Sequence, residues 1–149
     1  MGSRAIGLSD ELAEYILAHA TSPGSVQQRL IDETQQMPGA GMQISADQGE
    51  FFTILTSLIR PRFVVEVGTF TGYSALAIAK GLGPGGRILC CDVSEEWTSV
   101  ARRHWEHAGL ADRIELRLGP AIETLRSLPV DAVIDMAFID ADKTGYLSY

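Results

Sequence analysis

Four short apolar runs, separated by segments with helix signals, shape the second half of this 149-residue chain. The runs are Phe63–Val67, Arg87–Asp92, Ile114–Leu118 and Ala132–Ile139. The helices expected between them cover residues 72–82, 95–108 and 120–128. Because strands that alternate with helices are joined by right-handed crossovers, this order predicts a mostly parallel sheet with helices on both faces. The expected fold is a doubly wound, Rossmann-like α/β fold that stops after its fourth strand.

Three more helices are expected before the first strand. Apolar residues recur at helical spacing over 9–20, behind a serine cap, and a second helix covers 25–37. The third helix starts at Ser45 and ends before Pro61. Ser45 and Gln48 have the spacing of a capping box, in which each side chain bonds to the backbone of the other residue.

Length and composition fit one globular domain over residues 1–149. Hydrophobic residues make up 46% of the chain and charged residues 21%, which is enough apolar material for a core. We expect N-terminal helices over 1–60 and an incomplete Rossmann-like core over 61–149. The formal net charge of −7 argues against a nucleic-acid partner, because binding phosphates requires a basic face.

The adjacent cysteines and the lengths of the apolar runs bear on the protein's location. Cys90 and Cys91 follow one another in an expected strand, so their side chains point to opposite faces and cannot easily form a disulfide. We expect both to be reduced core residues. The N-terminus lacks the apolar core of a signal peptide, and no apolar run approaches the roughly 20 residues of a membrane helix. We therefore expect a cytoplasmic protein without a membrane partner.

Acidic residues mark the strand ends, where folds of this class bind ligands. The carboxylates there are Glu66, Asp92 and Asp140. The turn over residues 68–72 reads GTFTG, so Phe70 stands where a dinucleotide fingerprint has its second glycine. Phe70 would crowd a phosphate and Glu66 would repel it. The acidic rim suits the cationic sulfonium and ammonium of S-adenosylmethionine better, and an NAD(P)-dependent oxidoreductase is the alternative.

Further residues at this edge match parts of the same ligand. Ser74, near a helix N-terminus, can bind the methionine carboxylate. Asp92 can accept hydrogen bonds from both ribose hydroxyls, or it can cap the following turn. The backbone around Ala121 can contact the adenine edge. Glu66 either serves the ligand or pairs with a basic residue of the core, because burying it alone is costly.

Five motifs follow one another in a characteristic order and spacing. They are MQISADQGEFF, EVGTFTGYSALAIA, GRILCCDVS, GPAIETL and FIDADKTGY. Together they resemble the divalent-cation-dependent O-methyltransferases, the group of catechol and caffeoyl-coenzyme-A O-methyltransferases with its bacterial relatives. The resemblance implies a class I methyltransferase fold and methyl transfer from S-adenosylmethionine to a hydroxyl of a small phenolic acceptor. It also implies a homodimer.

The resemblance implies a cofactor role for each matching residue. The implied cofactor-binding residues are Met42, Ile44, Glu66, Gly68, Thr69, Ser74, Asp92, Ala121, Asp140 and Asp142. Glu66, Gly68 and Thr69 would line the amino-acid end of the cofactor. Met42 and Ile44 would fold over the cofactor and the acceptor.

The DADK motif carries the chemistry that the resemblance implies. Asp140 would bind a divalent cation such as Mg²⁺, and Asp142 would lie near the amino group of the cofactor. Lys143 would be the general base. A phenol with a pKa near 10 is a poor nucleophile at neutral pH, and a cation bound to its oxygen lowers that pKa.

The chain departs from the pattern at its end. The resemblance implies further strands, an aspartate–asparagine pair that completes the metal site and much of the acceptor pocket beyond Tyr149. We expect a bare edge on the fourth strand. We also expect that these 149 residues bind the cofactor weakly and do not turn over alone. A non-catalytic cofactor-binding or dimerisation module is the second alternative.

The remaining histidines and tryptophans have structural interpretations. His104 and His107 lie on the polar side of an expected helix and are expected at the surface, as is His19. Trp97 and Trp105 are expected to pack that helix against the core. The resemblance makes Trp97 a minor candidate for contact with adenine.

Overall fold

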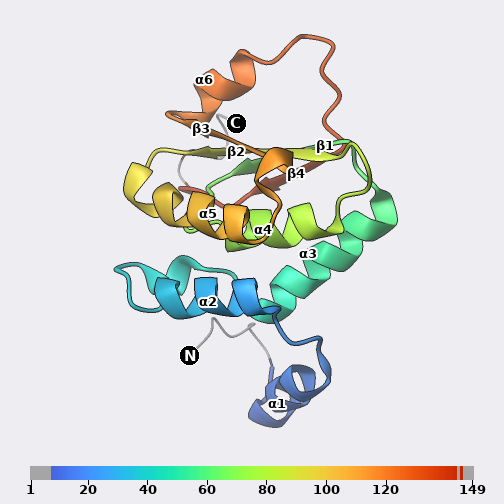
Figure 1. Ribbon diagram of the computed structural model, residues 1–149, viewed down its shortest axis with the longest axis vertical. Helices are drawn as coiled ribbons and strands as arrows, with labels where there is room; N and C mark the ends of the chain where they lie inside the picture. The colour runs from blue at the N-terminus through green and yellow to red at the C-terminus, as the bar shows by residue number, and fades with distance from the viewer. Residues whose placement is uncertain (1–7, 144, 146–149) are drawn as a thin grey trace.

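The computed structural model describes residues 8–143 and residue 145 (Figure 1). The helices are α1 (Asp10–His19), α2 (Ser25–Thr34), α3 (Ala46–Ile59), α4 (Tyr73–Gly81), α5 (Glu95–His107) and α6 (Ala121–Arg126), with the 3-10 turns η1 (Ala40–Met42) and η2 (Ala111–Arg113). The strands are β1 (Phe63–Val67), β2 (Arg87–Asp92), β3 (Ile114–Leu118) and β4 (Met136–Ile139). The first residues of the chain, on which the signal-peptide expectation partly rests, lie outside the described residues.

The four strands form one parallel sheet in the order β3-β2-β1-β4. Figure 1 shows α6 on one side of this sheet and α4 and α5 on the other, with α2 beneath them. This arrangement confirms the predicted doubly wound α/β fold. From β1 the chain adds β2 and β3 on one side of the sheet and β4 on the other. Ligands of such sheets bind beyond the carboxyl ends of the strands where the strand order reverses in this way.

Two apolar cores cover the two faces of the sheet. Cys90 belongs to the core between the sheet and helices α4 and α5. Cys91 belongs to the core on the opposite face, which α6 covers. Both cysteines are buried and free. The prediction of two reduced core residues on opposite faces of one strand is therefore confirmed.

The predicted start of α3 at Ser45 is confirmed, but its predicted capping box and the predicted start of β4 were wrong. Ser45 precedes α3, but its side chain makes no capping hydrogen bond, so the capping box is absent there. β4 begins at Met136, four residues later than expected. The reason lies in Asp135, whose carboxylate accepts hydrogen bonds from the backbone N–H groups of Arg62 (2.8 Å) and Phe63 (2.9 Å). The N–H of Asp135 also donates to the carbonyl oxygen of Phe63 at 2.9 Å, so this residue joins the chain to β1 and the paired strand continues from Met136.

The prediction of a surface position was wrong for His104 and correct for His107 and His19, which are exposed. His104 is buried because α2 packs across α5 and covers this part of its polar face. Its Nε2 lies 2.8 Å from a carboxylate oxygen of Glu33, and Arg103 donates to the other oxygen at 2.7 Å. The hydrogen bonds from His104 and then Arg103 lower the pKa of Glu33. This cluster docks α2 on α5.

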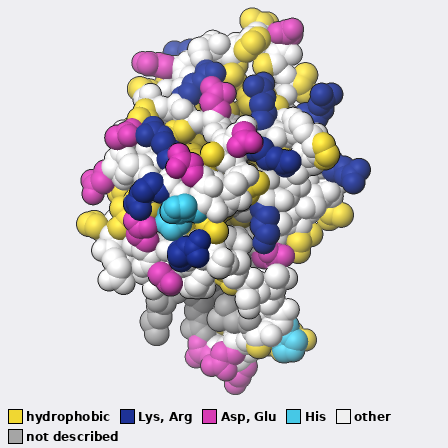
Figure 2. All heavy atoms as spheres, viewed as in Figure 1, with side chains coloured by type: hydrophobic (Ala, Val, Ile, Leu, Met, Phe, Trp, Pro, Cys, Tyr) yellow, Lys and Arg dark blue, Asp and Glu magenta, His cyan; other side chains and the backbone are white. Residues whose placement is uncertain are grey.

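The β4 edge of the sheet is open within the described residues, as expected, because β4 pairs only with β1. Charged side chains of both signs are interspersed on the face that Figure 2 shows. Within the part of the chain that the structure describes, no helix combines the length and the apolar character needed to cross a membrane.

Candidate functional site

A cavity of about 980 Å³ opens beyond the carboxyl ends of the strands. Every predicted site residue except Glu66 lines it. These residues are Met42, Ile44, Gly68, Thr69, Ser74, Asp92, Ala121, Asp140, Asp142 and Lys143. They come from five separate parts of the chain, and the sheet brings them together. Its volume suits a small organic ligand, since such pockets measure about 300–1,000 Å³. The individual roles of these residues remain predictions.

Gly68 has a packing reason to be glycine as well as a place on the cavity wall. Its φ is +91°, and a Cβ there would overlap the carbonyl group of Asp140 and lie 3.0 Å from the Cα of Ala141. The N–H of Asp140 in turn donates to the carbonyl oxygen of Val67 at 2.9 Å. The ends of β1 and β4 therefore meet only because residue 68 lacks a side chain.

Asp92 fixes the glycine turn against β2. One oxygen of its carboxylate accepts hydrogen bonds from the backbone N–H groups of Thr69 and Phe70, each at 2.8 Å. The other accepts from the N–H of Ser94 at 2.9 Å. The capping role that the sequence left open is therefore present. A carboxylate offers about four acceptor positions, so Asp92 also retains capacity for a ligand hydroxyl.

Glu66 lies behind the cavity wall and is completely buried. Among the described residues, neither of its carboxylate oxygens has a hydrogen-bond partner, and the hydroxyl of Thr69 also lacks one. Burial raises the pKa of Glu66 to about 7, while the nearby hydroxyls of Ser74 and Thr69 partly oppose this rise. The basic partner considered from the sequence is thus not observed among the described residues. Unsatisfied buried polar atoms beside a cavity are what a polar ligand or a water would satisfy.

An aromatic pair forms another wall. Trp97 was a minor candidate for contact with adenine, whereas Phe70 was not predicted to contact the ligand. Phe70 and Trp97 both line the cavity, with their rings edge to face and 5.0 Å apart. Phe70 has a φ of +52°, which is uncommon for a residue other than glycine. Such backbone strain is concentrated at functional sites. Only the backbone conformation marks Phe70, so the sequence held no signal for it beyond its place in the turn.

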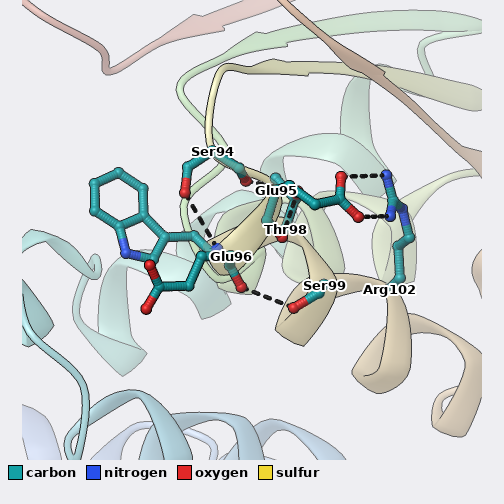
Figure 3. Close-up of polar contacts among 7 residues, drawn as sticks. Ser94, Glu95, Glu96, Thr98, Ser99 and Arg102 are labelled. Atoms are coloured by element: carbon teal, nitrogen blue, oxygen red, sulfur yellow. Dashed lines mark hydrogen bonds and ion pairs between the residues drawn. The ribbon is translucent and has the colours of Figure 1, made fainter.

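The start of α5 places Trp97 on this wall. The hydroxyl of Ser94 accepts a hydrogen bond from the N–H of Trp97 at 3.3 Å, and the Thr98 hydroxyl donates to the Ser94 carbonyl at 2.7 Å (Figure 3). Glu95, the first residue of α5, forms an ion pair at 2.7 Å with Arg102 further along the same helix (Figure 3). The cap predicted at Ser94 is confirmed, and its hydrogen bond to the backbone of Trp97 fixes the start of α5, from which Trp97 reaches the cavity.

Within the described residues, the acidic side of the cavity does not form a complete metal centre. Asp140, Asp142 and Lys143 lie together on the wall. However, the described residues contain no group of three or more His, Cys, Asp or Glu side chains placed to bind a metal ion. Mg²⁺ requires octahedral coordination, so Asp140 alone could not complete its coordination shell.

Comparison with known proteins gives a consistent result. A sequence model of the family described as O-methyltransferase matches residues 18–149. Caffeoyl-CoA O-methyltransferase 2 of Petunia hybrida is 37% identical over 155 residues, which cover 100% of this chain and 64% of that relative. Probable caffeoyl-CoA O-methyltransferase 2 of Dictyostelium discoideum is 34% identical and is covered to 63%.

Solved structures agree with the sequence comparison. The O-methyltransferase from Bacillus cereus, crystallised in complex with SAH, has a TM-score of 0.79 and 31% identity to this chain. The match covers 89% of this chain and 61% of that one. The chain thus spans about 63% of the length of the curated relatives that it matches.

Proposed function

Because this chain belongs to the O-methyltransferase family, we propose that it binds S-adenosylmethionine in the cavity beyond β1, β2 and β4. We further propose that it serves methyl transfer to a hydroxyl of a small phenolic acceptor. The observation that carries the proposal is the single cavity into which the sheet gathers the residues expected to bind the cofactor. Family membership leaves the oxidoreductase alternative without support.

The methionine end of the cofactor would lie against the glycine turn. Thr69, whose hydroxyl has no hydrogen-bond partner among the described residues, lines this side of the cavity, and the buried carboxyl of Glu66 lies behind it. A cationic ammonium group nearby favours the ionised carboxylate, so ligand binding would lower the pKa of Glu66 from its value of about 7. Ser74 would bind the carboxylate of the ligand, and Gly68 would leave room for its chain.

The nucleoside end would lie between Asp92 and Ala121. Asp92 would accept a hydrogen bond from one ribose hydroxyl at the acceptor position that its three backbone contacts leave open. The backbone at Ala121 would contact the adenine edge. Phe70 and Trp97 provide apolar surface on the same cavity, which suits an aromatic ring.

The transfer itself is an in-line displacement, and the protein contributes mainly by alignment. Proximity and orientation are worth roughly 7–11 kcal/mol in favourable cases. Lys143 would accept the hydroxyl proton of the acceptor. Met42 and Ile44 would cover the cofactor and the acceptor from the segment before α3.

We keep Mg²⁺ in the proposal with Asp140 as one ligand, because a carboxylate at the cavity wall suits this cation. When bound, it would lower the pKa of the acceptor hydroxyl. The described residues contain no group of three or more His, Cys, Asp or Glu side chains that could complete its coordination. For this reason we propose weak cofactor binding and no turnover by these 149 residues alone. A homodimer in the cytoplasm, with no nucleic-acid or membrane partner, completes the proposal.

Calorimetric titration with S-adenosylhomocysteine and with NAD⁺ tests the cofactor. We expect weak 1:1 binding of the first and no binding of the second, and the reverse result would refute the proposal. Incubation with S-adenosylmethionine and a catechol or caffeoyl thioester, with Mg²⁺ or with chelator, tests the chemistry. Mg²⁺-dependent product from this chain would exclude the non-catalytic alternative, and it would also refute the expected lack of turnover.

A further inference from the structure

One loop joins α2 to α3 and forms part of the cavity wall. It leaves α2 after Thr34 and contributes residues 41–44 to the lining. The side-chain amide of Gln43 donates a hydrogen bond to the hydroxyl of Thr34 at 3.3 Å. This bond closes the base of the loop, so the geometry of the wall over 41–44 depends on Thr34.

Thr34 also contacts a second segment of the cavity lining. Its hydroxyl donates to the hydroxyl of Thr71 at 2.9 Å, although the two residues are 37 positions apart. Both threonines are completely buried. Thr71 belongs to the glycine turn, and Thr71 and Gln43 line the cavity whereas Thr34 does not. The buried hydroxyl of Thr34 therefore connects two parts of the cavity lining, although Thr34 itself does not line the cavity.

The position of α2 does not depend on this hydroxyl. Glu33, the preceding residue, bonds to His104 and Arg103 on α5 at 2.8 and 2.7 Å. Leu30, one turn earlier, is completely buried in the core. Loss of the Thr34 hydroxyl would therefore leave the helix docked and would release the loop from the glycine turn.

We propose that Thr34 is a positioning residue of the cofactor site, which fixes the loop over 35–43 against the glycine turn and thereby sets cofactor affinity. The inference rests on the proposed function. Without the hydroxyl, Thr71 loses its donor and Gln43 its acceptor. Gln43 is only partly buried, so its amide turns to solvent and the wall formed by Met42 and Ile44 loses its fixed position.

The test compares Thr34→Val, which keeps the side-chain shape, with Thr34→Ser, which keeps the hydroxyl. Thr53→Val is the matched control, because the Thr53 hydroxyl also bonds to a neighbouring helix, at the carbonyl of Ala77 (2.9 Å), but lies outside the cavity. Calorimetry with S-adenosylhomocysteine should show about tenfold weaker binding for Thr34→Val. The other two variants should stay within about twofold of the unmodified chain.

Hydrogen exchange of the ligand-free chain gives an independent readout. The N–H groups of Met42 and Gln43 donate to the carbonyls of Gly39 (2.8 Å) and Ala40 (3.2 Å) inside the loop. They should exchange faster in Thr34→Val and at the unmodified rate in Thr34→Ser and Thr53→Val. If Thr34→Val does not fold, Gln43→Met removes the donor at a partly exposed position, and the same faster exchange is expected.

The outcomes separate the inference from the proposed function. If the unmodified chain does not bind S-adenosylhomocysteine, the proposed function fails and the affinity part of the inference fails with it, while exchange still decides whether Thr34 fixes the loop. If the unmodified chain binds and Thr34→Val binds equally well, the inference is overturned. Unchanged exchange in Thr34→Val, or in its Gln43→Met substitute, also overturns it.

Discussion

The neighbouring strands β1 and β4 differ in how far their side chains are exposed to solvent. All five residues of β1 are buried, whereas β4 alternates between half-buried and exposed residues. β1 lies between β2 and β4, with apolar cores on both faces, whereas β4 pairs with β1 alone. The two runs look alike in sequence, so the difference shows that the number of neighbours, and not the apolar pattern, decides how deeply a strand is buried.

The surroundings of β4 extend this contrast. The exposed apolar side chains before and within β4 are Val130, Val133, Ile134 and Ile139. On α3 they are Phe51, Ile54, Leu58 and Ile59. The two groups belong to adjoining elements, because Phe52 of α3 packs on Phe138 of β4 with the rings 4.7 Å apart. We therefore expect substitutions to cost much stability around β1 and little around β4.

The largest effect is expected at Gly68, where the two regions meet. In Gly68→Ala, the new Cβ collides with the backbone of Asp140 and the positive φ is strained. We expect a loss of about 3–5 kcal/mol in the free energy of unfolding, measured with urea. Gly85→Ala is the control, because Gly85 also has a positive φ (+76°) but nothing lies near its Cβ. It should cost only about 1–2 kcal/mol. Equal losses would show that a Cβ at residue 68 does not collide with the backbone of Asp140.

The next effect concerns the buried carboxyl of β1. The pKa of Glu66 rises from 4.5 to about 7 on folding, so between these values the native state binds more protons than the unfolded state. Stability contributed by the protonated form is therefore complete below pH 4.5 and is lost as the pH rises through 7. The unmodified chain should lose roughly 3 kcal/mol relative to Glu66→Gln across this range. Parallel stability curves for the two chains, from denaturation at several pH values, would contradict this.

Two valines give a matched pair across the comparison. Val64 in β1 is 0% exposed and Val133 before β4 is 72% exposed. Val64→Ala leaves a cavity in the core and should lower the free energy of unfolding by about 2–3 kcal/mol. Val133→Ala should change it by less than about 0.5 kcal/mol. A comparable loss at both positions would mean that the β4 region is buried in solution.

The smallest effect is expected at Asp135, the exposed carboxylate that joins the two regions. Hydrogen bonds from the backbone N–H groups of Phe63 and then Arg62 lower its pKa below 3.8. The native state thus favours the charged form, and this stability is present above pH 3.8 and lost as the pH falls through the lowered pKa. Asp135→Asn should have a slightly lower melting temperature at pH 7, and the difference should shrink in acid. A difference that grows in acid would show that the carboxylate is not bonded in this way.

Much of the fold could be predicted because its signals are local. The caps at Ser9 and Ser94 and the span of β1 are set by residues within a few positions of one another. The predictions failed where distant segments intervene. His104 is buried by α2, 71 positions away, and β4 starts late because Asp135 bonds to residues more than 70 positions earlier.

Some features of the candidate site could likewise be predicted from the sequence, and others could not. The acidic residues and the glycine turn at the strand ends were visible in the sequence, because parallel strands bring their carboxyl ends to one edge. That Glu66 lies behind the wall with no partner among the described residues, and that Thr34 joins the loop to the turn, was not visible.

The order of helices and strands, the family, and the residue types that meet at the end of the sheet could all be predicted from local features of the amino-acid sequence. Local periodicity, caps and motif spacing are properties of short segments, and they persist in any arrangement of those segments. Packing of the segments sets which of these residues face the cavity, which hydroxyl bonds to two parts of its lining and which carboxyl has a raised pKa. Those properties arise from burial and from hydrogen bonds between segments far apart in the chain, so they exist only once the segments are packed together.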